Sequence, residues 1–177
     1  MVVYSASGRE VSLRNLSAGD VFGELAAVDG LPRSASVVAD TEARVAALRR
    51  EDFREVLMRS PATAFWLAKL LTGKIRDINE RLFELSALNV PARLHCELLR
   101  LARTTPDPNA PMVIDPAPTH AELANRIGSH REAVTREIRA LVERNILRAG
   151  RRTLEILDIA RLEYFVGQAV GGLLAQR

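Results

Sequence analysis

An arginine-rich polar face on a predicted helix carries the clearest chemistry in the sequence. Arg131, Glu132 and Arg136 lie on one side of the segment "REAVTREIRAL", and Arg139 continues that side. An arginine guanidinium can pair with guanine through two hydrogen bonds, and a glutamate carboxylate can accept a hydrogen bond from the cytosine amino group. A helix that carries these groups near its N-terminus suits the major groove of DNA. The alternative is a solvated surface helix with an i,i+4 ion pair between Glu132 and Arg136.

The positive charge of the chain is concentrated around this helix. The formal net charge is +3 over 177 residues. Residues 1–88 contain 12 basic and 12 acidic side chains, whereas residues 89–177 contain 13 and 10. Between Arg126 and Arg152, eight arginines stand against three glutamates, which gives a net charge of +5 in 27 residues. A local positive field of this kind attracts a polyanion such as nucleic acid.

Two patterns of the form Ser/Thr-x-x-Glu predict that two helices begin ten residues apart. Thr119 with Glu122, and Ser129 with Glu132, have the spacing of capping boxes, in which a hydroxyl and a carboxylate bond to backbone N–H groups at a helix start. Gly128 lies between them and can take the left-handed conformation that ends the first helix. The sequence therefore predicts a helix-turn-helix whose second helix carries the arginines.

Each of these two helices has an apolar face of its own. The residues predicted to be buried are Leu123, Ala124 and Ile127 in the first helix, and Val134, Ile138 and Leu141 in the second. This spacing turns the polar side chains at the start of the second helix outward, and they are Arg131, Glu132, Thr135 and Arg136. The second helix is thus predicted to pack on one side and to bind on the other.

Other groups near the second helix are placed to reach DNA phosphates. Ser129 and His130 stand at its start, where the positive end of the helix helps to bind an anion, and Arg139 lies further along. The segment "LRAGRRTLEIL" follows and predicts a hairpin with residues 149–151 at its tip. A hairpin in this position makes the motif a winged helix, with arginines at the tip that can add contacts to the DNA backbone.

A second candidate site lies in "FGELAAVDGLPRSASVV", residues 22–38. Gly23 and Glu24 precede apolar residues and predict a short helical turn whose free N–H groups can bind phosphate with no side chain in the way. Arg33 can supply the countercharge, and Ser34 adds a hydroxyl. Glu24 can accept a hydrogen bond from a ribose hydroxyl. The alternative is a structural ion pair between Glu24 and Arg33 inside a small barrel.

Three successive parts of the chain are predicted to position these groups. Residues 1–60 form the first part, in which short strands and turn signals between Val2 and Leu48 predict a small all-β unit. The strand signals include the alternation in "EVSLRNL" and "ASVVA", and the period becomes helical at "REDFREVLMRS". Residues 61–88 form a long helix that opens at Pro61. Residues 89–177 form a mostly helical unit that contains the helix-turn-helix. Within it, the Pro-rich "TTPDPNAPMVIDPAP" predicts a loop with one short strand, and the apolar residues of "EYFVGQAVGGLLAQR" predict a last helix packed on the body. The predicted fold class is α+β.

A heptad pattern runs along the long helix. Its apolar residues alternate in spacing between four and three, and they are Ala64, Ala68, Leu71, Ile75, Ile78, Leu82 and Leu85. A seam of this length usually faces a second helix of the same kind, so we expect a parallel homodimer. The alternative is that the seam packs against its own domain.

Composition and spacing exclude several classes of function. The single cysteine, Cys96, rules out an intrachain disulfide, and its apolar surroundings predict a buried structural thiol. The histidines at positions 95, 120 and 130 lack the spacing of a metal site, and no pair of nucleophile and base marks a catalytic centre. There is no apolar run of membrane-spanning length and no signal-peptide pattern. We expect a cytoplasmic protein that is not an enzyme, needs no metal and contacts no membrane.

The two candidate sites resemble parts of one known family. "FGELAAVDGLPRSASVV" closely resembles the phosphate-binding cassette of cyclic-nucleotide-binding domains, and "GSHREAVTREIRAL" resembles the recognition element of the Crp/Fnr family of bacterial transcription regulators. The order of the parts is also similar to that of the family. The resemblance implies a partial cyclic-nucleotide-binding β-roll in residues 1–60, a dimerisation helix in residues 61–88 and a C-terminal winged helix-turn-helix in residues 89–177.

For the cassette, the resemblance implies that Glu24 meets the ribose 2′-hydroxyl of a cyclic nucleotide such as cyclic AMP. Arg33, Ser34 and nearby backbone N–H groups would hold the cyclic phosphate; the implied backbone positions are Gly23, Leu25 and Ala26. The family's cyclic AMP receptors carry a Thr-Ser or Thr-Asn pair on the dimer helix that reaches the purine. Ile78 and Asn79 occupy those positions here, and Asn79 suits the contact whereas Ile78 has no hydroxyl. No cofactor is required.

On the DNA side, the resemblance assigns base reading to Arg131, Glu132 and Arg136. It implies a palindromic site with half-sites resembling TGTGA, one for each subunit. Phosphate-contacting positions of the family are matched by Thr119, Ser129 and His130. The implied partners are double-stranded DNA, a second copy of the chain and RNA polymerase.

Two regulatory schemes follow from the resemblance. In the first, an effector bound in the roll controls DNA binding; in the second, DNA binding is independent of ligand and the roll is only a dimerisation scaffold. Ile78 favours the second scheme. So does the start of the chain, because in the family further strands of the roll precede the strand that "MVVYSASGREV" resembles. The chain is then a fragment, the product of a start assigned downstream, or a shortened regulator.

Overall fold

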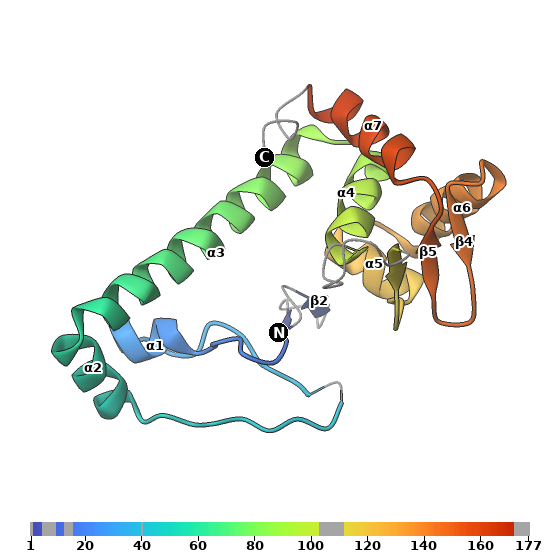
Figure 1. The fold of residues 1–177 in the computed structure, drawn as a ribbon. Coiled ribbons are helices and arrows are strands. Elements are labelled where there is room, and N and C mark those ends of the chain that lie inside the picture. The colour runs from blue at the N-terminus through green and yellow to red at the C-terminus, as the bar shows by residue number, and fades with distance from the viewer. Residues whose placement is uncertain (1, 5–9, 13–15, 40, 103–111, 172–177) are drawn as a thin grey trace. The chain divides into compact units, whose positions relative to one another are not determined.

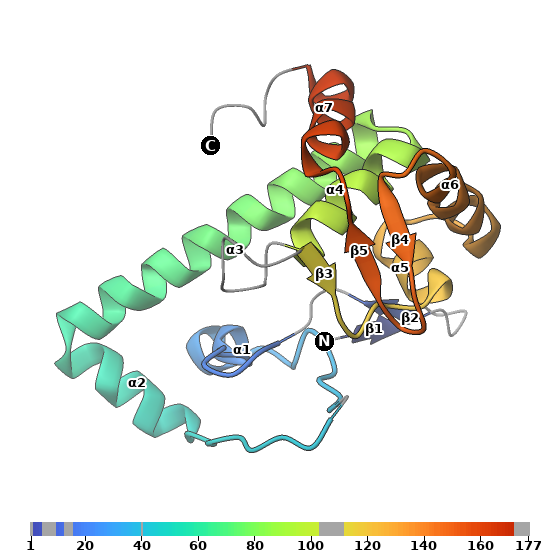
Figure 2. The same cartoon turned by 45° about the vertical axis from the view of Figure 1, so that its right-hand side comes forward.

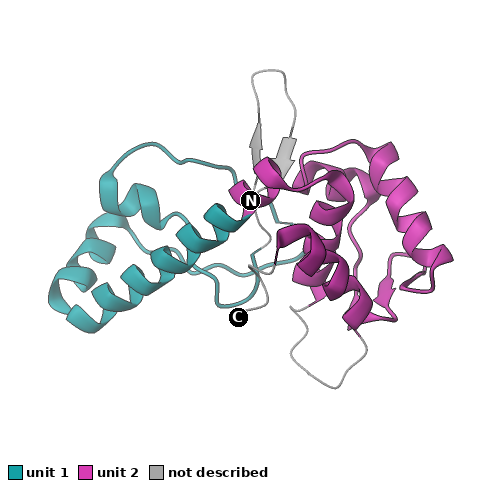
Figure 3. Ribbon diagram, turned by 90° about the horizontal axis from the view of Figure 1, so that it is seen from above, with its two compact units in different colours: residues 1–80 teal, residues 81–177 magenta. Residues whose placement is uncertain are grey.

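A computed structural model describes residues 2–4, 10–12, 16–39, 41–102 and 112–171 of the chain (Figure 1). Most of the Pro-rich segment between the predicted helices lies outside the described residues, as do the last six residues. The chain divides into two compact units, residues 1–80 and residues 81–177 (Figure 3). The boundary falls inside the long helix α3 (Pro61–Ala87), and each unit is described by itself.

The first unit begins with a two-stranded antiparallel ribbon. Strand β1 (Val2–Tyr4) pairs with β2 (Glu10–Ser12), and Val3 lies opposite Val11. A short helix follows, α1 (Glu24–Asp29), and a glycine with a φ of 80° stands at each of its ends. Helix α2 (Arg50–Arg59) then leads into α3. In this unit α1 packs against α2.

The prediction of several short strands between Val2 and Leu48 is only partly right. Within the described residues of that segment, the strands are β1 and β2, and "ASVV" contributes a single bridge residue, Ser36. Residues 41–49 form neither helix nor strand, and Val38, Val45 and Leu48 expose their side chains. A strand needs a partner for its backbone groups, and where none pairs with it the apolar alternation alone does not produce a sheet.

Helix α3 begins at Pro61 and continues through Gly73 to Ala87, as the sequence predicts. Proline is tolerated at its first position because the N–H that it lacks would have no partner in the helix. Leu67 is the buried residue of α3, whereas Ile75, Ile78, Leu82 and Leu85 of the heptad pattern are exposed. The apolar seam of α3 is therefore uncovered in the single chain.

The second unit is a helical domain with a small sheet. After the end of α3, its elements are α4 (Val90–Ala102), β3 (Met112–Ile114), α5 (His120–Arg126), α6 (Arg131–Glu143), β4 (Leu147–Ala149), β5 (Leu154–Ile156) and α7 (Ile159–Val170). Strand β5 is antiparallel to both its neighbours, and Ile156 lies opposite Met112 of β3 and Leu147 of β4 (Figure 2). The sheet confirms the short strand and the hairpin that the sequence predicts.

The core of this unit is formed by apolar faces at helical spacing. In α4, Leu94 and Leu98 are fully buried one turn apart, and α4 packs against α7. The segment "EYFVGQAVGGLLAQR" is predicted to form a last helix packed on the body, and α7 confirms this as far as Val170; Leu162 and Val166 of α7 are buried. The buried apolar residues of α4, α5, α6 and α7 and of the sheet belong to one core cluster.

Cys96 lies within this core. Its side chain is buried, and burial, followed by the charge of Glu84, raises the pKa of the Cys96 thiol to about 11. The thiol is therefore neutral at physiological pH, which agrees with the structural role that its apolar surroundings predict. None of the helices in the described ranges is long and apolar enough to cross a membrane.

Candidate nucleic-acid interface and ligand cassette

The turn between α5 and α6 positions the arginine-bearing helix. The capping box of α5 is formed: Thr119 Oγ1 accepts from the Glu122 N–H at 3.2 Å, and Glu122 Oε2 accepts from the Thr119 N–H at 2.6 Å. Gly128 has a φ of 61°, and the Ser129 N–H then donates to the Ala124 carbonyl oxygen at 2.8 Å. These contacts end α5 as a Schellman motif, and they confirm the predicted role of Gly128.

The second predicted capping box is wrong. The N-cap of α6 is His130, and no side chain caps this helix start. Ser129 is not the N-cap of α6, because its backbone N–H is donated to the end of α5 and the residue is buried. Helix α6 therefore begins one residue later than the pattern of Ser129 and Glu132 predicts. The sequence does contain the capping-box spacing, but the Ser129 N–H is used to end α5.

Helix α6 is seated by the apolar residues that the sequence predicts. Val134, Ile138 and Leu141 are buried on one side of α6, and Leu123, Ala124 and Ile127 are buried in and after α5. A second attachment is polar: His95 of α4 shares a hydrogen bond with Glu137 of α6, 2.8 Å from Nε2 to Oε1. Burial lowers the pKa of His95, although Glu137 opposes this effect. The buried side fixes which residues of α6 face outward.

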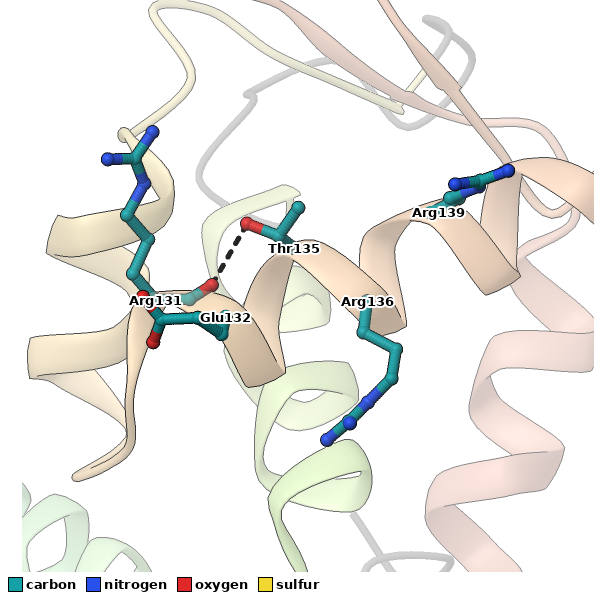
Figure 4. Close-up of a pocket in the computed structure, with 5 residues that line it drawn as sticks. All are labelled: Arg131, Glu132, Thr135, Arg136 and Arg139. Atoms are coloured by element: carbon teal, nitrogen blue, oxygen red, sulfur yellow. Dashed lines mark hydrogen bonds between the residues drawn. The ribbon is translucent and has the colours of Figure 1, made fainter.

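The outward face of α6 forms an open pocket (Figure 4). Its lining residues are Arg131, Glu132, Thr135, Arg136 and Arg139. All five residues are exposed, and Arg139 pairs with Glu143 at 2.9 Å on the surface. Among the described ion pairs there is none between Glu132 and Arg136, which was the alternative reading of this face. Two cationic groups and a carboxylate at the helix start are therefore available to a ligand.

The remaining residues assigned to phosphates lie outside this pocket. Thr119 and His130 are exposed at the N-caps of α5 and α6. Ser129 is buried. His120 was missed by the sequence reasoning: its Nδ1 lies 2.8 Å from Thr135 Oγ1, fifteen residues away, and no local pattern indicates a contact between two separate helices.

The β4–β5 hairpin differs slightly from the prediction. Ala149 ends β4, and residues 150–153 form the turn, closed by a hydrogen bond from the Gly150 N–H to the Thr153 carbonyl oxygen at 2.9 Å. Arg152 takes a φ of 65° in this turn, and Arg151 and Arg152 are exposed. The tip is thus longer than residues 149–151, and it presents two arginine side chains.

In the first unit, the residues of the cassette are held by contacts that the sequence did not predict. Glu24 is 5% exposed and pairs with Lys74 of α3, 2.8 Å from Oε1 to Nζ. Arg33 Nη1 donates to the Gly23 carbonyl oxygen at 2.7 Å. The predicted alternative, an ion pair between Glu24 and Arg33, is therefore not the arrangement found. No sequence pattern links Glu24 to Lys74, which stands fifty positions further along the chain.

The backbone at Gly23 requires glycine. Its φ is 80°, and a Cβ at this position would lie 2.4 Å from Arg33 Nη1. Helix α1 begins directly after it with Glu24, Leu25 and Ala26. Ser34 and Asn79 are exposed, and the described contacts join neither of them to Glu24 or Arg33. The structure thus brings Gly23, Glu24 and Arg33 together, whereas Ser34 and Asn79 have no described contact with Glu24 or Arg33.

Comparisons with known proteins match both halves of the chain. The model of the cyclic nucleotide-binding domain matches residues 1–60, and the model of the Crp-like helix-turn-helix domain matches residues 92–165. The chain is 36% identical to the cyclic AMP receptor protein of Thermus thermophilus over 156 residues, which cover 88% of this chain and 69% of that protein. It is 31% identical to a CRP-like cAMP-activated global transcriptional regulator of Mycobacterium tuberculosis, with 88% and 70% covered.

A solved structure agrees with these matches. A transcriptional regulator of the CRP/FNR family from Thermus thermophilus is similar with a TM-score of 0.76 and 27% sequence identity. The match covers 95% of this chain and 82% of that protein.

Proposed function

This chain belongs to the Crp/Fnr family of transcription regulators, and from that premise we propose that it binds a palindromic DNA site as a homodimer under the control of a small effector. The family assignment makes the chain a transcription regulator with cyclic nucleotide-binding and helix-turn-helix domains, and it is not an enzyme. The site sequence, the dimer, the effector, a direct contact with RNA polymerase and action in the cytoplasm are parts of the proposal.

The observation that carries the proposal is the exposed polar face of α6. In the proposed complex this face enters the major groove, where Arg131 and Arg136 pair with guanine and Glu132 accepts from cytosine. Thr119, His130 and Arg139 contact phosphates, and the net positive charge of this segment favours the approach of DNA. Ser129 is left out of the proposed contacts because its side chain is buried.

Arg131→Ala is expected to weaken specific DNA binding by about 1–3 kcal/mol and to relax selectivity at one base pair, because a bidentate base contact is lost. Arg139→Ala is the matched control, since a lost phosphate contact weakens binding to all sequences about equally. Fluorescence anisotropy with the palindrome and its single-base variants, at one fixed salt concentration, measures both. Unchanged selectivity in Arg131→Ala would show that Arg131 is not a base-reading residue.

The cassette supports control by a phosphorylated effector, and we propose a cyclic nucleotide such as cyclic AMP. Gly23, Leu25 and Ala26 offer backbone groups at the start of α1, and the Arg33 guanidinium lies beside them. In the proposed complex the cyclic phosphate replaces the Gly23 carbonyl oxygen as the acceptor for Arg33, Ser34 adds a hydroxyl, and Glu24 meets the ribose. Asn79 on α3 contacts the purine. The effector changes DNA affinity only through its different affinities for two protein states, typically about 1–3 kcal/mol.

Arg33→Ala is expected to abolish the response of DNA binding to cyclic AMP and to leave DNA binding without nucleotide unchanged. The reason is that Arg33 supplies the countercharge for the phosphate and lies in a different unit from α6. The measurement is the palindrome affinity of both proteins with and without cyclic AMP. If the unsubstituted chain itself shows no response to cyclic AMP, the alternative scheme holds, in which the roll serves only dimerisation.

The exposed seam of α3 supports the homodimer. Ile78 is 63% exposed, and Ile75, Leu82 and Leu85 are exposed on the same heptad pattern. Burying this seam against a second α3 removes the apolar side chains from water and places two copies of α6 for two half-sites.

Ile78→Asp is expected to convert the protein to a monomer and to lower its affinity for the palindrome to that for a single half-site, because two carboxylates would be buried in the seam. Analytical ultracentrifugation measures the mass, and Arg76→Asp on the polar side of α3 is the control. A dimer that persists unchanged in Ile78→Asp would contradict the proposed seam.

A further inference from the structure

A histidine of α5 contacts a threonine of α6 that lines the open pocket. His120 Nδ1 lies 2.8 Å from Thr135 Oγ1. Thr135 Oγ1 lies 2.9 Å from the carbonyl oxygen of Arg131, one turn earlier in α6 (Figure 4). Thr135 lines the same pocket as Arg131, Glu132 and Arg136. These two residues have no role in the proposed function described above.

The direction of both hydrogen bonds follows from the chemistry of the groups. A threonine hydroxyl has one proton and two lone pairs, and a backbone carbonyl can only accept. The hydroxyl proton of Thr135 is therefore donated to the Arg131 carbonyl oxygen. Since no proton remains on Oγ1, His120 Nδ1 must carry the proton of the second bond and donate it to Thr135. This fixes the neutral ring of His120 as the Nδ1–H tautomer.

These bonds select one orientation of the Thr135 side chain. A helical threonine is divided between two χ1 rotamers, because its hydroxyl can bond to carbonyl groups of the preceding turn. The bond from His120 fixes the hydroxyl on the side of α5. Figure 4 shows the Thr135 oxygen directed to the Arg131 carbonyl and the γ-methyl directed away from it. The hydroxyl proton and one of its two lone pairs are used by these bonds, so the hydroxyl can no longer donate to a ligand. The γ-methyl is the apolar group that Thr135 has for a ligand of the pocket that it lines.

We propose that Thr135 is a specificity-determining residue that reads the 5-methyl group of a thymine, and that His120 is a positioning residue that holds it in the reading orientation. Apolar contact with the thymine methyl is an established way to recognise this base in the major groove. The inference rests on the proposed function, in which α6 enters that groove. It adds a thymine contact on the same helix face as the guanidinium and carboxylate groups of Arg131, Glu132 and Arg136.

The experiment compares duplexes that differ only in one methyl group. Fluorescence anisotropy measures the affinity of the full chain for a labelled TGTGA-type palindrome and for duplexes in which each thymine in turn is replaced by deoxyuridine, at one salt concentration with cyclic AMP present. Uracil pairs as thymine does but lacks the 5-methyl. The unsubstituted protein is expected to lose affinity about fourfold per half-site at one thymine position, the effect of exposing one methyl group.

Variants of Thr135 distinguish the effect of its methyl from that of its hydroxyl, and variants of His120 test whether this residue positions the Thr135 side chain. Thr135→Val keeps the methyl and is expected to keep the discrimination, whereas Thr135→Ser keeps the hydroxyl and is expected to lose it. His120→Ala is expected to reduce the discrimination to less than about twofold, because the second rotamer of Thr135 becomes populated. His120→Asn is expected to restore it, since the asparagine amide N–H can take the place of Nδ1–H.

The outcomes separate this inference from the proposed function. Equal affinity of the unsubstituted protein for all thymine and uracil duplexes, together with clear preference for the palindrome over a scrambled duplex, would overturn the thymine contact and leave the proposed function standing. Full discrimination in His120→Ala would overturn the positioning role. No preference for the palindrome at all would contradict the proposed function itself. Circular dichroism and the affinity for the scrambled duplex show whether each variant is folded.

Discussion

Leu141→Ala is expected to lower the free energy of unfolding of the C-terminal unit, residues 81–177, by about 2–5 kcal/mol. This is the range for a large-to-small substitution in a packed core. Leu141 is 0% exposed, and it is one of the residues that seat α6 on the rest of the unit. The shorter side chain leaves a cavity behind α6, so the affinity for DNA is expected to fall together with the stability. Urea denaturation followed by circular dichroism measures the change.

Val142→Ala is the matched control for this prediction. Val142 follows Leu141 in α6 and is exposed, so its truncation is expected to change stability by no more than about 0.5 kcal/mol. If both variants lose the same amount, or if Leu141→Ala loses less than Val142→Ala, the packing of α6 differs from the arrangement in this structure.

Glu97→Ala is expected to destabilise the C-terminal unit by about 3–5 kcal/mol, because removing one partner of a buried ion pair leaves charge buried without its countercharge. The Glu97 side chain is 3% exposed, and it pairs with Arg100 of its own helix and with Arg126 of α5 at 3.2 Å. Arg100 also pairs with Glu84 in the last turns of α3. Burial alone would lower the pKa of Arg100, but Glu97 and Glu84 raise it above its usual value.

Glu143→Ala is the comparison that shows whether burial is the reason. Glu143 pairs with Arg139 at 2.9 Å, but the two side chains are 63% and 81% exposed, and a pair of this kind contributes about 0–1 kcal/mol. Both substitutions remove one glutamate from an arginine pair, and both are measured by urea denaturation. Similar losses in the two variants would mean that Glu97 is solvated in solution.

The sequence predicts most of the recognition element because its signals are local. The Thr119 capping box, the left-handed Gly128 and the apolar spacing from Leu123 to Leu141 each concern residues within a few turns of one another, and the structure confirms them. The Ser129 box failed for a local reason as well. Two motifs competed for one residue, and the Schellman ending of α5 took its backbone N–H.

Contacts between distant elements could not be predicted in this way. The pair of Glu24 with Lys74 joins residues fifty positions apart, and the bond of His120 with Thr135 joins two helices. Their partners are set by how elements pack, and no spacing rule links them. The strand pattern of "ASVV" failed for a similar reason, because a strand depends on a partner elsewhere in the chain and the pattern gives only the alternation. The resemblance of the whole chain to the Crp/Fnr family is confirmed by the comparisons.

The central claim is that the outward face of α6 reads a palindromic DNA sequence. It is tested most directly by titrating a labelled duplex with two TGTGA-type half-sites, and a scrambled duplex of the same composition, with the full chain at one physiological salt concentration, with and without cyclic AMP. We predict that in at least one of the two conditions the palindrome is bound about a thousandfold or more tightly than the scrambled duplex. Equal affinity for the two duplexes in both conditions would contradict the claim.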